Sequence, residues 1–417
     1  MRNYIVYFFI IFPFLPCSAQ EKQTLKLTCW QVENLFFQQN MLLIAEQMNV
    51  DKADASILQA KLWDNPELSV EQINFWGGAE KEKQFSIELS QLFVVARKRS
   101  KLVAREKISK EMSVTEMKEL IRSLITELRK SVYEMQYLQA FSRTVYNRQQ
   151  SLEQLIDTYR KQVEAGNMSK NELLRLQSSL LEIENEANEL ETALNEQQKN
   201  IKSLLCLDTY INVEILPDET LFTSPEHLSQ ADLMEQALQS RPDLEYLQLE
   251  KKFHEKSFIY EKSLAVPDIT LSANYDRYGG VWKDFVGVGI SFNLPFLNRN
   301  QGNIRAAKIS MQQSEYLFLQ KMKVVQHEIT EAFDNYCRAY KLYEKTKANE
   351  FIFELDNMLE TCARNFLNRN ISMLEYLDYM EAYKNGMQTV LIADKNLRNC
   401  FAELQYVTGN EIKQDNK

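Results

Sequence analysis

The sequence predicts a mainly helical protein with a small β part, and three observations support this prediction. Glycine and proline number only 10 and 8 in 417 residues, where average usage would give roughly 29 and 21. Neither residue occurs between Ala79 and Ala165 or between Asn303 and Asn385, so long helices are expected there. Between the helical regions, two segments of about ten residues alternate apolar and polar side chains, which is typical of strands.

Residues 1–19 have the pattern of a signal peptide. An apolar run of about 12 residues, Tyr4–Leu15, precedes a small-residue cleavage site, so the mature chain is expected to begin at Gln20. The alternatives are a buried N-terminal helix and a lipid-modified Cys17, although Pro16 stands where a lipoprotein carries a small residue. No later apolar stretch is long enough for a helical span, so membrane insertion would have to use strands.

Composition and motifs exclude several classes of function. The net charge of −9 and the pI of about 5.3 provide no basic surface for nucleic acid. Three scattered histidines do not suit a metal site, and no zinc-protease, serine-hydrolase, dinucleotide or phosphate-loop motif occurs. No enzyme activity, cofactor or bound metal is therefore expected. Five cysteines follow the signal peptide without a CxxC pair, and most are expected to be small buried residues: Cys29, Cys206, Cys337, Cys362 and Cys400.

The mature chain repeats one plan at an offset of 201 to 203 residues, which indicates internal duplication. The first repeat is expected at residues 20–215 and the second at 241–410, with a connecting segment at 216–240 and a tail at 411–417. The matching segments are Asn65-Pro66-Glu67-Leu68 with Val266-Pro267-Asp268-Ile269, and Gly166-Asn167-Met168-Ser169 with Arg369-Asn370-Ile371-Ser372.

Each repeat is predicted to contain a helix, two strands, a very long helix, a short turn and a shorter helix. Counted from Ala96 to Ala165, the first long helix has 70 residues, which is about 105 Å at 1.5 Å per residue and far more than a compact globule needs. The expected strands lie at about 68–75, 84–93, 269–278 and 285–294, the long helices at about 96–164 and 303–367, the turns at 165–169 and 368–372, and the shorter helices at about 170–206 and 373–407.

The helices after the turns carry apolar residues at seven-residue spacing, which is typical of coiled coils. An ordinary amphipathic bundle helix has a similar local pattern, and the length of the preceding helices favours the coiled coil. The clearest rows are Leu173, Leu180, Ala187, Leu194 and Ile201 in the first repeat, and Tyr376, Tyr383, Val390, Leu397 and Leu404 in the second.

The strands predict a sheet with two different faces. In 269–278, the polar residues Thr270, Ser272, Asn274 and Asp276 alternate with apolar ones. A soluble antiparallel sheet shows the same alternation, but strands of this length also cross a bilayer. Four strands cannot close a barrel, so several chains would have to share one barrel. Three chains would contribute twelve strands. In such a barrel the four polar residues are predicted to face the lumen, and the apolar set to face lipid.

The sequence resembles the TolC-type outer-membrane efflux proteins over nearly the whole mature chain. The segment around Phe285–Gly302 is the most specific, and it is most similar to the branch that serves heavy-metal resistance-nodulation-division pumps. The other segments that support the resemblance are Asn65–Leu68, the Gly166 turn and Ala237–Leu244.

The resemblance implies a homotrimer in the cell outer membrane with a large periplasmic part. It implies a twelve-stranded transmembrane barrel continued by a periplasmic α-barrel. Substrate, such as heavy-metal cations, would pass passively from an inner-membrane pump and a periplasmic adaptor to the outside. Arg369 stands where the family commonly has glycine, and the segment 96–99 is unusually basic. The adaptor would dock on the tip turns, at Gly166, Asn167, Met168, Ser169, Arg369, Asn370, Ile371 and Ser372.

Three acidic residues, Glu172, Glu375 and Asp378, lie within two helical turns of the predicted tips. In a threefold assembly each would recur three times around the axis. Such a ring is predicted to select cations, or to close the channel by pairing with Arg369. The alternatives to an efflux duct are a soluble periplasmic coiled-coil scaffold or adaptor-like binding module, and the exit duct of a type I protein secretion system.

Overall fold

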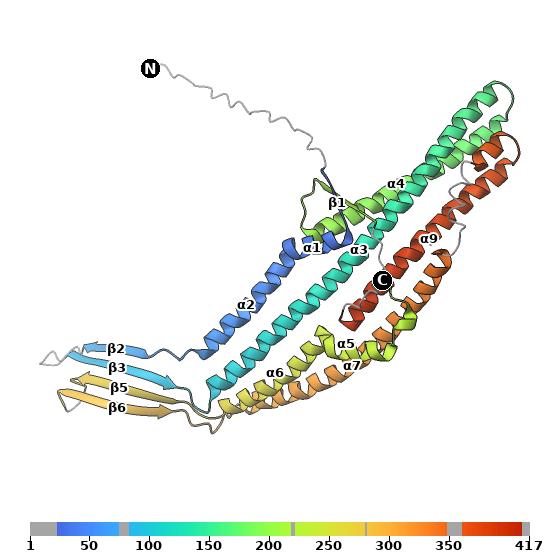
Figure 1. The fold of residues 1–417 in the computed structure, drawn as a ribbon. Coiled ribbons are helices and arrows are strands. Elements are labelled where there is room, and N and C mark those ends of the chain that lie inside the picture. Colours follow the sequence, from blue (N-terminus) through green and yellow to red (C-terminus); the bar gives the residue numbers. More distant parts are fainter. Residues whose placement is uncertain (1–22, 75–82, 218–221, 280–281, 348–360, 411–417) are drawn as a thin grey trace, which may run out of the picture.

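The computed structural model describes residues 23–74, 83–217, 222–279, 282–347 and 361–410. They form an elongated rod of helices, with a small sheet at one end and, at the other, two turns that connect helices (Figure 1). The predicted class, mainly helical with a small β part, is confirmed. The predicted signal peptide at 1–19, the tail at 411–417 and part of the helix expected at 303–367 lie outside the described residues.

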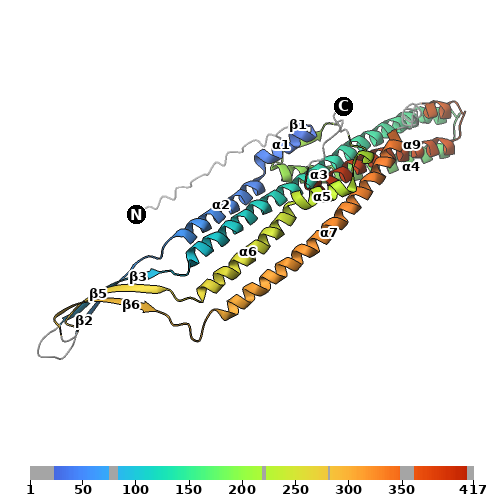
Figure 2. The same ribbon diagram turned by 60° about the horizontal axis from the view of Figure 1, so that its bottom comes forward.

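Two very long helices give the rod its length. α3 (Lys98–Glu164) has 67 residues and α7 (Gln301–Lys347) has 47. α3 packs along α2, α4, α6 and α9, as Figure 2 shows from a second side. No helix of the described residues is long and apolar enough to span a membrane. The further helices are α1 (Cys29–Gln39), α2 (Met41–Lys61), α4 (Lys170–Leu205), α5 (Gln230–Ser240), α6 (Pro242–Leu264) and α9 (Met373–Thr408), with a 3-10 turn at Pro225–His227.

The sheet at the end of the rod joins the hairpins of the two halves. Its strands follow the order β2-β3-β5-β6 and are antiparallel throughout, so β2 and β6 are the outer strands. β2 pairs continuously with β3, although the alternation of apolar and polar residues in β2 changes phase at Gln72-Ile73. The pairing is made by backbone hydrogen bonds, which do not depend on the side chains. The strands are β2 (Glu67–Asn74), β3 (Lys83–Phe93), β5 (Ile269–Arg277) and β6 (Asp284–Phe292).

Several element boundaries differ from the sequence prediction. α3 begins at Lys98, because Ala96 and Arg97 are left-handed at φ of 56° and 57°. α4 ends before Cys206, which caps the helix in a left-handed conformation at φ 52°. The predicted connecting segment 216–240 contains α5. A separate parallel pair, β1 (Gln23–Leu27) with β4 (Ile211–Ile215), was not predicted, because these strands of five residues lie far apart in sequence.

Buried apolar side chains form clusters along the rod. One lies beside the tip turns, and the others lie where α1, β1 and β4, or α5 and α7, pack on the long helices. Most of the cysteines were expected to be buried, but Cys362 alone is, and Cys206 is exposed at a helix end. The heptad rows of α4 and α9 face the clusters, and their buried members include Leu173, Ile201, Tyr376, Tyr383, Leu397 and Leu404.

Candidate functional site

The two tip turns lie together at the end of the rod opposite the sheet (Figure 1). In both, one backbone N–H donates to the carbonyl five residues earlier, and the preceding N–H donates to the carbonyl three residues earlier. This pair of backbone hydrogen bonds ends a helix in a tight turn. The pairs are Asn167 with Gln162 (2.9 Å) and Gly166 with Val163 (3.0 Å), then Asn370 with Asn365 (2.8 Å) and Arg369 with Phe366 (3.0 Å).

Arg369 takes the place and the backbone conformation that Gly166 has in the first turn. Its φ is 61°, against 76° for Gly166, and a residue with a Cβ pays about 1–2 kcal/mol there. Its guanidinium donates a hydrogen bond to the Asn167 carbonyl and lies 3.9 Å from the Met168 sulfur. Met168 and Ile371 also pack against the buried cluster below. The residue that departs from glycine in the sequence therefore joins the two turns.

Two serines begin the helices that leave the turns, and they act differently. Ser372 forms a capping box in which its N–H donates to the Glu375 carboxylate at 2.7 Å, and the Glu375 N–H donates to its hydroxyl at 3.3 Å. Hydrogen bonds to the Glu375 carboxylate, first from the Ser372 backbone and then from the Ser372 side chain, lower its pKa below the ordinary value. Ser169 makes no side-chain bond of this kind. Glu375 is therefore already engaged in starting α9.

The other two predicted aperture residues are in different surroundings. Glu172 accepts a hydrogen bond from the Tyr159 hydroxyl, and burial, with this carboxylate, raises the pKa of Tyr159 to about 12. Asp378 is exposed on α9 and contacts no charged or hydrogen-bonding partner among the described residues. The three acidic groups thus form no single cluster within one chain. Across the described residues, no group of three His, Cys, Asp or Glu side chains could hold a metal ion.

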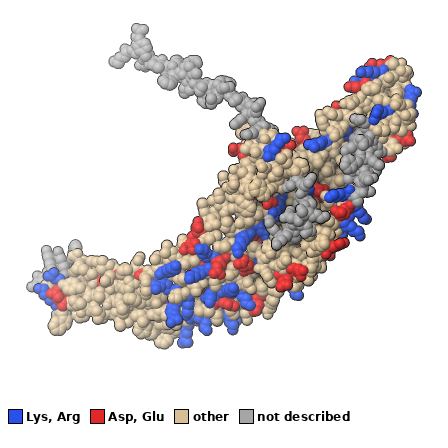
Figure 3. Space-filling view, in the orientation of Figure 1, with Lys and Arg blue, Asp and Glu red and all other residues tan. Residues whose placement is uncertain are grey.

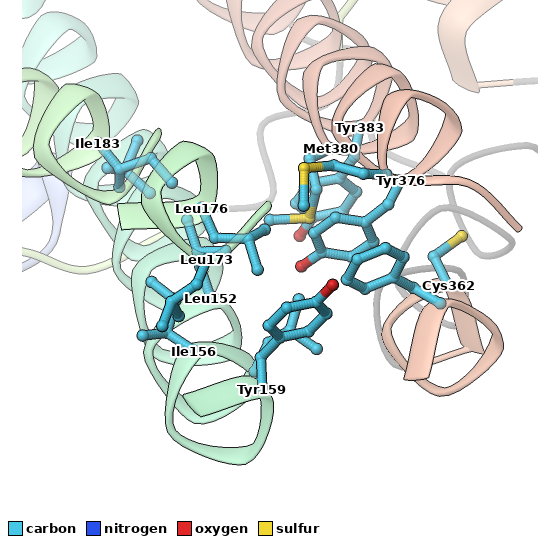
Figure 4. Packing of buried hydrophobic residues seen from close by; sticks show 14 of the residues in the cluster. Leu152, Ile156, Tyr159, Leu173, Leu176, Ile183, Cys362, Tyr376, Met380 and Tyr383 are labelled. Carbon is cyan, nitrogen blue, oxygen red and sulfur yellow. The ribbon is translucent and has the colours of Figure 1, made fainter. Parts of the chain in front are cut away.

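A column of stacked aromatic rings lies beside the turns. Tyr159 stacks on Phe366 with ring centroids 5.6 Å apart, and Phe366 stacks on Tyr376 at 5.3 Å. Figure 4 shows Tyr159 and Tyr376 approaching each other from α3 and α9, with Met380 beside them. Tyr376 is fully buried, its hydroxyl has no hydrogen-bond partner among the described residues, and burial raises its pKa. The heptad row contained Tyr376, but nothing in the sequence indicated the stacking.

The sheet has a partly covered polar face and an exposed apolar one. Thr270, Ser272, Asn274 and Asp276 all lie on the partly covered face. Opposite them, a Cβ on Gly287 would lie 2.3 Å from the Asn274 amide oxygen, so the glycine makes room for that side chain. On the other face Val286, Val288 and Ile290 are 75%, 90% and 71% exposed. The alternation thus separates two chemically different surfaces.

The Arg241-Pro242-Asp243 string forms a buried charge cluster in the middle of the rod, a role that sequence reasoning missed. The Arg241 side chain, 1% exposed, lies 2.7 Å from the Glu328 carboxylate of α7 and 2.9 Å from the Asp243 carboxylate. It also donates to the Val407 carbonyl at 3.0 Å, near the end of α9. One side chain therefore connects α6, α7 and α9. Lys321 lies 3.0 Å from Asp243 and completes the cluster.

Electrostatics within this cluster keep Arg241 and Asp243 charged. Burial lowers the pKa of Arg241, but hydrogen bonds and charge from Asp243 and Glu328 outweigh it and raise the pKa above its ordinary value. Burial raises the pKa of Asp243, but Arg241 and Lys321 outweigh it and hold this pKa well below its usual range. Gly409 ends α9 beside the cluster at φ 75°, and a Cβ there would lie 3.1 Å from the Arg241 backbone.

Solved structures match the chain over nearly its whole length. The Campylobacter jejuni outer membrane channel CmeC superposes with a TM-score of 0.78 at 14% identity, covering 93% of this chain and 87% of that one. CusC, whose structures are described in terms of folding and transmembrane channel formation, superposes with a TM-score of 0.72 at 16% identity, covering 92% of both chains. The outer-membrane channel OprN superposes with a TM-score of 0.72 at 14% identity, covering 92% of this chain and 90% of that one. No family model and no curated protein matches. The predicted resemblance to TolC-type outer-membrane channels is confirmed at the level of fold.

Proposed function

We propose that this chain is an outer-membrane channel with a large periplasmic part, and that it forms the exit duct of a tripartite efflux system. The fold shared with outer-membrane channels supports the assignment. The observation that carries it is the exposed apolar face of the sheet, which spans several strands. Val288 and Ile290 on β6, Leu271 on β5 and Leu68 on β2 are 90%, 71%, 43% and 63% exposed.

An apolar surface of this kind is stable only against lipid or another protein. We place it in the hydrocarbon core, with Thr270, Ser272, Asn274 and Asp276 toward an aqueous lumen. Unpaired strand edges are not tolerated in lipid, so the outer strands β2 and β6 require partners. Pairing of β6 in one copy with β2 in the next would close a barrel, and three copies would give the twelve strands predicted from the sequence.

The helices would continue the barrel into the periplasm as a tunnel. Conduction would be passive, because an inner-membrane pump supplies the energy and a periplasmic adaptor joins the pump to the tip turns. The surface offered to the adaptor contains Gly166 to Ser169 and Arg369 to Ser372. Heavy-metal cations are the proposed cargo, supported by the sequence resemblance around Phe285–Gly302 and by the acidic residues near the tip.

The mass of the protein extracted from outer membranes tests this proposal. Light scattering in detergent, with the detergent mass subtracted, should give the mass of three protomers, and the same sample should conduct ions across a planar bilayer. A soluble periplasmic scaffold or adaptor-like module would instead leave the envelope in a salt wash at the mass of one protomer, and that outcome would reject the channel. The third possibility also predicts trimers that conduct. If such trimers come from cells that contain a type I exporter and no metal pump, the protein-secretion duct would be favoured.

A further inference from the structure

A cavity of about 710 Å³ lies where the helical rod meets the sheet. The end of α2, the start of α3 and the end of α6 enclose it. Its walls combine apolar and aromatic side chains with arginines, among them Leu62, Trp63, Arg97, Arg99, Arg105 and Tyr260. The basic segment noted in the sequence thus lines a cavity. Figure 3 shows Lys and Arg gathered over the sheet-proximal ends of the helices.

The positive charge of this cavity is only partly neutralised by the chain. Four basic residues line it, Arg97, Lys98, Arg99 and Arg105, against three acidic ones, Asp64, Glu106 and Asp268. Lys98 is buried and lies 2.7 Å from Asp268, and Arg105 lies 2.6 Å from Glu106. Arg97 is exposed and forms no ion pair with the described residues. The Arg99 Nη1 atom is buried and has no hydrogen-bond partner there, which leaves a donor that requires an acceptor.

A row of aromatic contacts connects this charge to the apolar face of the sheet. Phe93 pairs with Ile269 in the ladder and shares that face. The Trp63 ring packs edge-on against Phe93 with centroids 6.5 Å apart, and the Arg99 guanidinium lies 3.8 Å above the Trp63 ring. Trp63 is 59% exposed. Apolar surface, a tryptophan and an unpaired arginine therefore follow one another from the sheet into the cavity.

We propose that this cavity binds the phosphate headgroup of an anionic phospholipid from the inner leaflet of the outer membrane. Arg97 and Arg99 would pair with the phosphate, and an acyl chain would lie on Trp63 and Phe93. Tryptophan favours the membrane interface, and basic groups there attract anionic lipids. A phosphate oxygen supplies the acceptor that Arg99 lacks. The inference rests on the proposed function, since it requires the sheet to lie in the membrane.

Quenching of Trp63 fluorescence by brominated lipids tests the site. The detergent-purified mature protein is titrated with brominated phosphatidylglycerol or brominated phosphatidylcholine, and the signal lost in Trp63→Phe identifies the share of this residue. The mole fraction of phosphatidylglycerol that quenches Trp63 should be lower than that of phosphatidylcholine, by on the order of fivefold for each arginine. High salt should reduce this difference between the two lipids. Arg97→Gln with Arg99→Gln should abolish the preference, whereas Lys107→Gln, outside the cavity, should keep it.

Three outcomes would overturn the inference. Equal quenching by the two lipids in the wild-type protein would show no headgroup recognition. Full competition by inorganic phosphate at matched ionic strength would assign the site to a free anion. Loss of the trimer in Arg99→Gln with lipid preference retained would make Arg99 a contact between subunits. A protein that needs no detergent would instead refute the proposed channel, so failure of the two proposals can be told apart.

Discussion

The Arg369 guanidinium donates a hydrogen bond to the backbone carbonyl of Asn167, 202 residues earlier in the chain. The contact joins the two tip turns directly. Each turn also contributes an apolar residue, Met168 or Ile371, to the buried cluster beside it. The tip is therefore one surface built from both halves of the chain, and a partner that binds it would contact both turns together.

The first prediction separates the backbone and side-chain roles of Arg369. Arg369→Ala keeps the left-handed strain and loses the hydrogen bond, and should destabilise the protein by about 1 kcal/mol. Arg369→Gly also loses the bond but removes a strain of similar size, and should stay close to wild type. Thermal unfolding in detergent measures both. A glycine variant less stable than the alanine variant would contradict this explanation.

The second prediction concerns the buried charge cluster. Arg241→Met leaves the carboxylates of Asp243 and Glu328 without their main partner, and should cost about 3–5 kcal/mol of unfolding free energy. Lys251→Met is the matched control, because Lys251 forms a partly exposed ion pair with Glu315 at 3.1 Å and should cost at most about 1 kcal/mol. Denaturant unfolding compares the two, and equal effects would show that burial of Arg241 is unimportant.

The third prediction is a pH dependence at the same place. Because the pKa of Asp243 is depressed in the folded chain, its stabilising contribution is present above the unfolded pKa of about 4 and is lost as pH falls below it. The stability difference between wild type and Asp243→Asn should therefore be largest near neutral pH and shrink on acidification. Unfolding midpoints measured over this range provide the test, and a difference independent of pH would contradict it.

The fourth prediction concerns cation selection at the tip. Asp378 is the exposed acidic group among the three candidates that has no partner among the described residues, so Asp378→Asn should lower cation over anion selectivity in single-channel recordings. Glu375→Ala should also weaken the cap of α9, because it removes the acceptor of the Ser372 N–H. Asp157→Asn, another exposed acid of the tip region, is the control because Asp157 pairs with Arg160 at 3.4 Å. Unchanged selectivity in Asp378→Asn would reject the predicted aperture.

The fifth prediction tests the packing of the polar sheet face. Gly287→Ala places a Cβ against the end of the Asn274 side chain, which must turn away, and should destabilise the assembly by about 1 kcal/mol. Asn274→Ala in the same chain removes the clash and should restore stability. The heat resistance of the detergent-extracted oligomer on a gel is a direct measure. If the double variant is no better than Gly287→Ala, the two residues do not oppose each other as described.

Much of the architecture could be predicted because it follows from local chemistry. Long stretches without glycine or proline become helices wherever they lie, and period-two alternation gives strands with different faces. Gly166 identified its turn by the same logic, since only glycine takes a left-handed conformation without strain. The irregular strand β2 shows the limit, because its pairing with β3 and not its own pattern determines its course.

The sequence by itself thus determined the helices, the strand faces and the position of the turns. Only the tertiary structure decided which residues act together: Arg241 with Glu328, Tyr159 with Phe366 and Tyr376, and Arg99 with Trp63. Apart from Phe366 and Tyr376, the partners are distant in the chain, and no periodic pattern of the sequence pairs them, so their members look like ordinary surface or core residues when each is considered alone. Their burial and charge are fixed by neighbours that only packing of the long helices brings within reach.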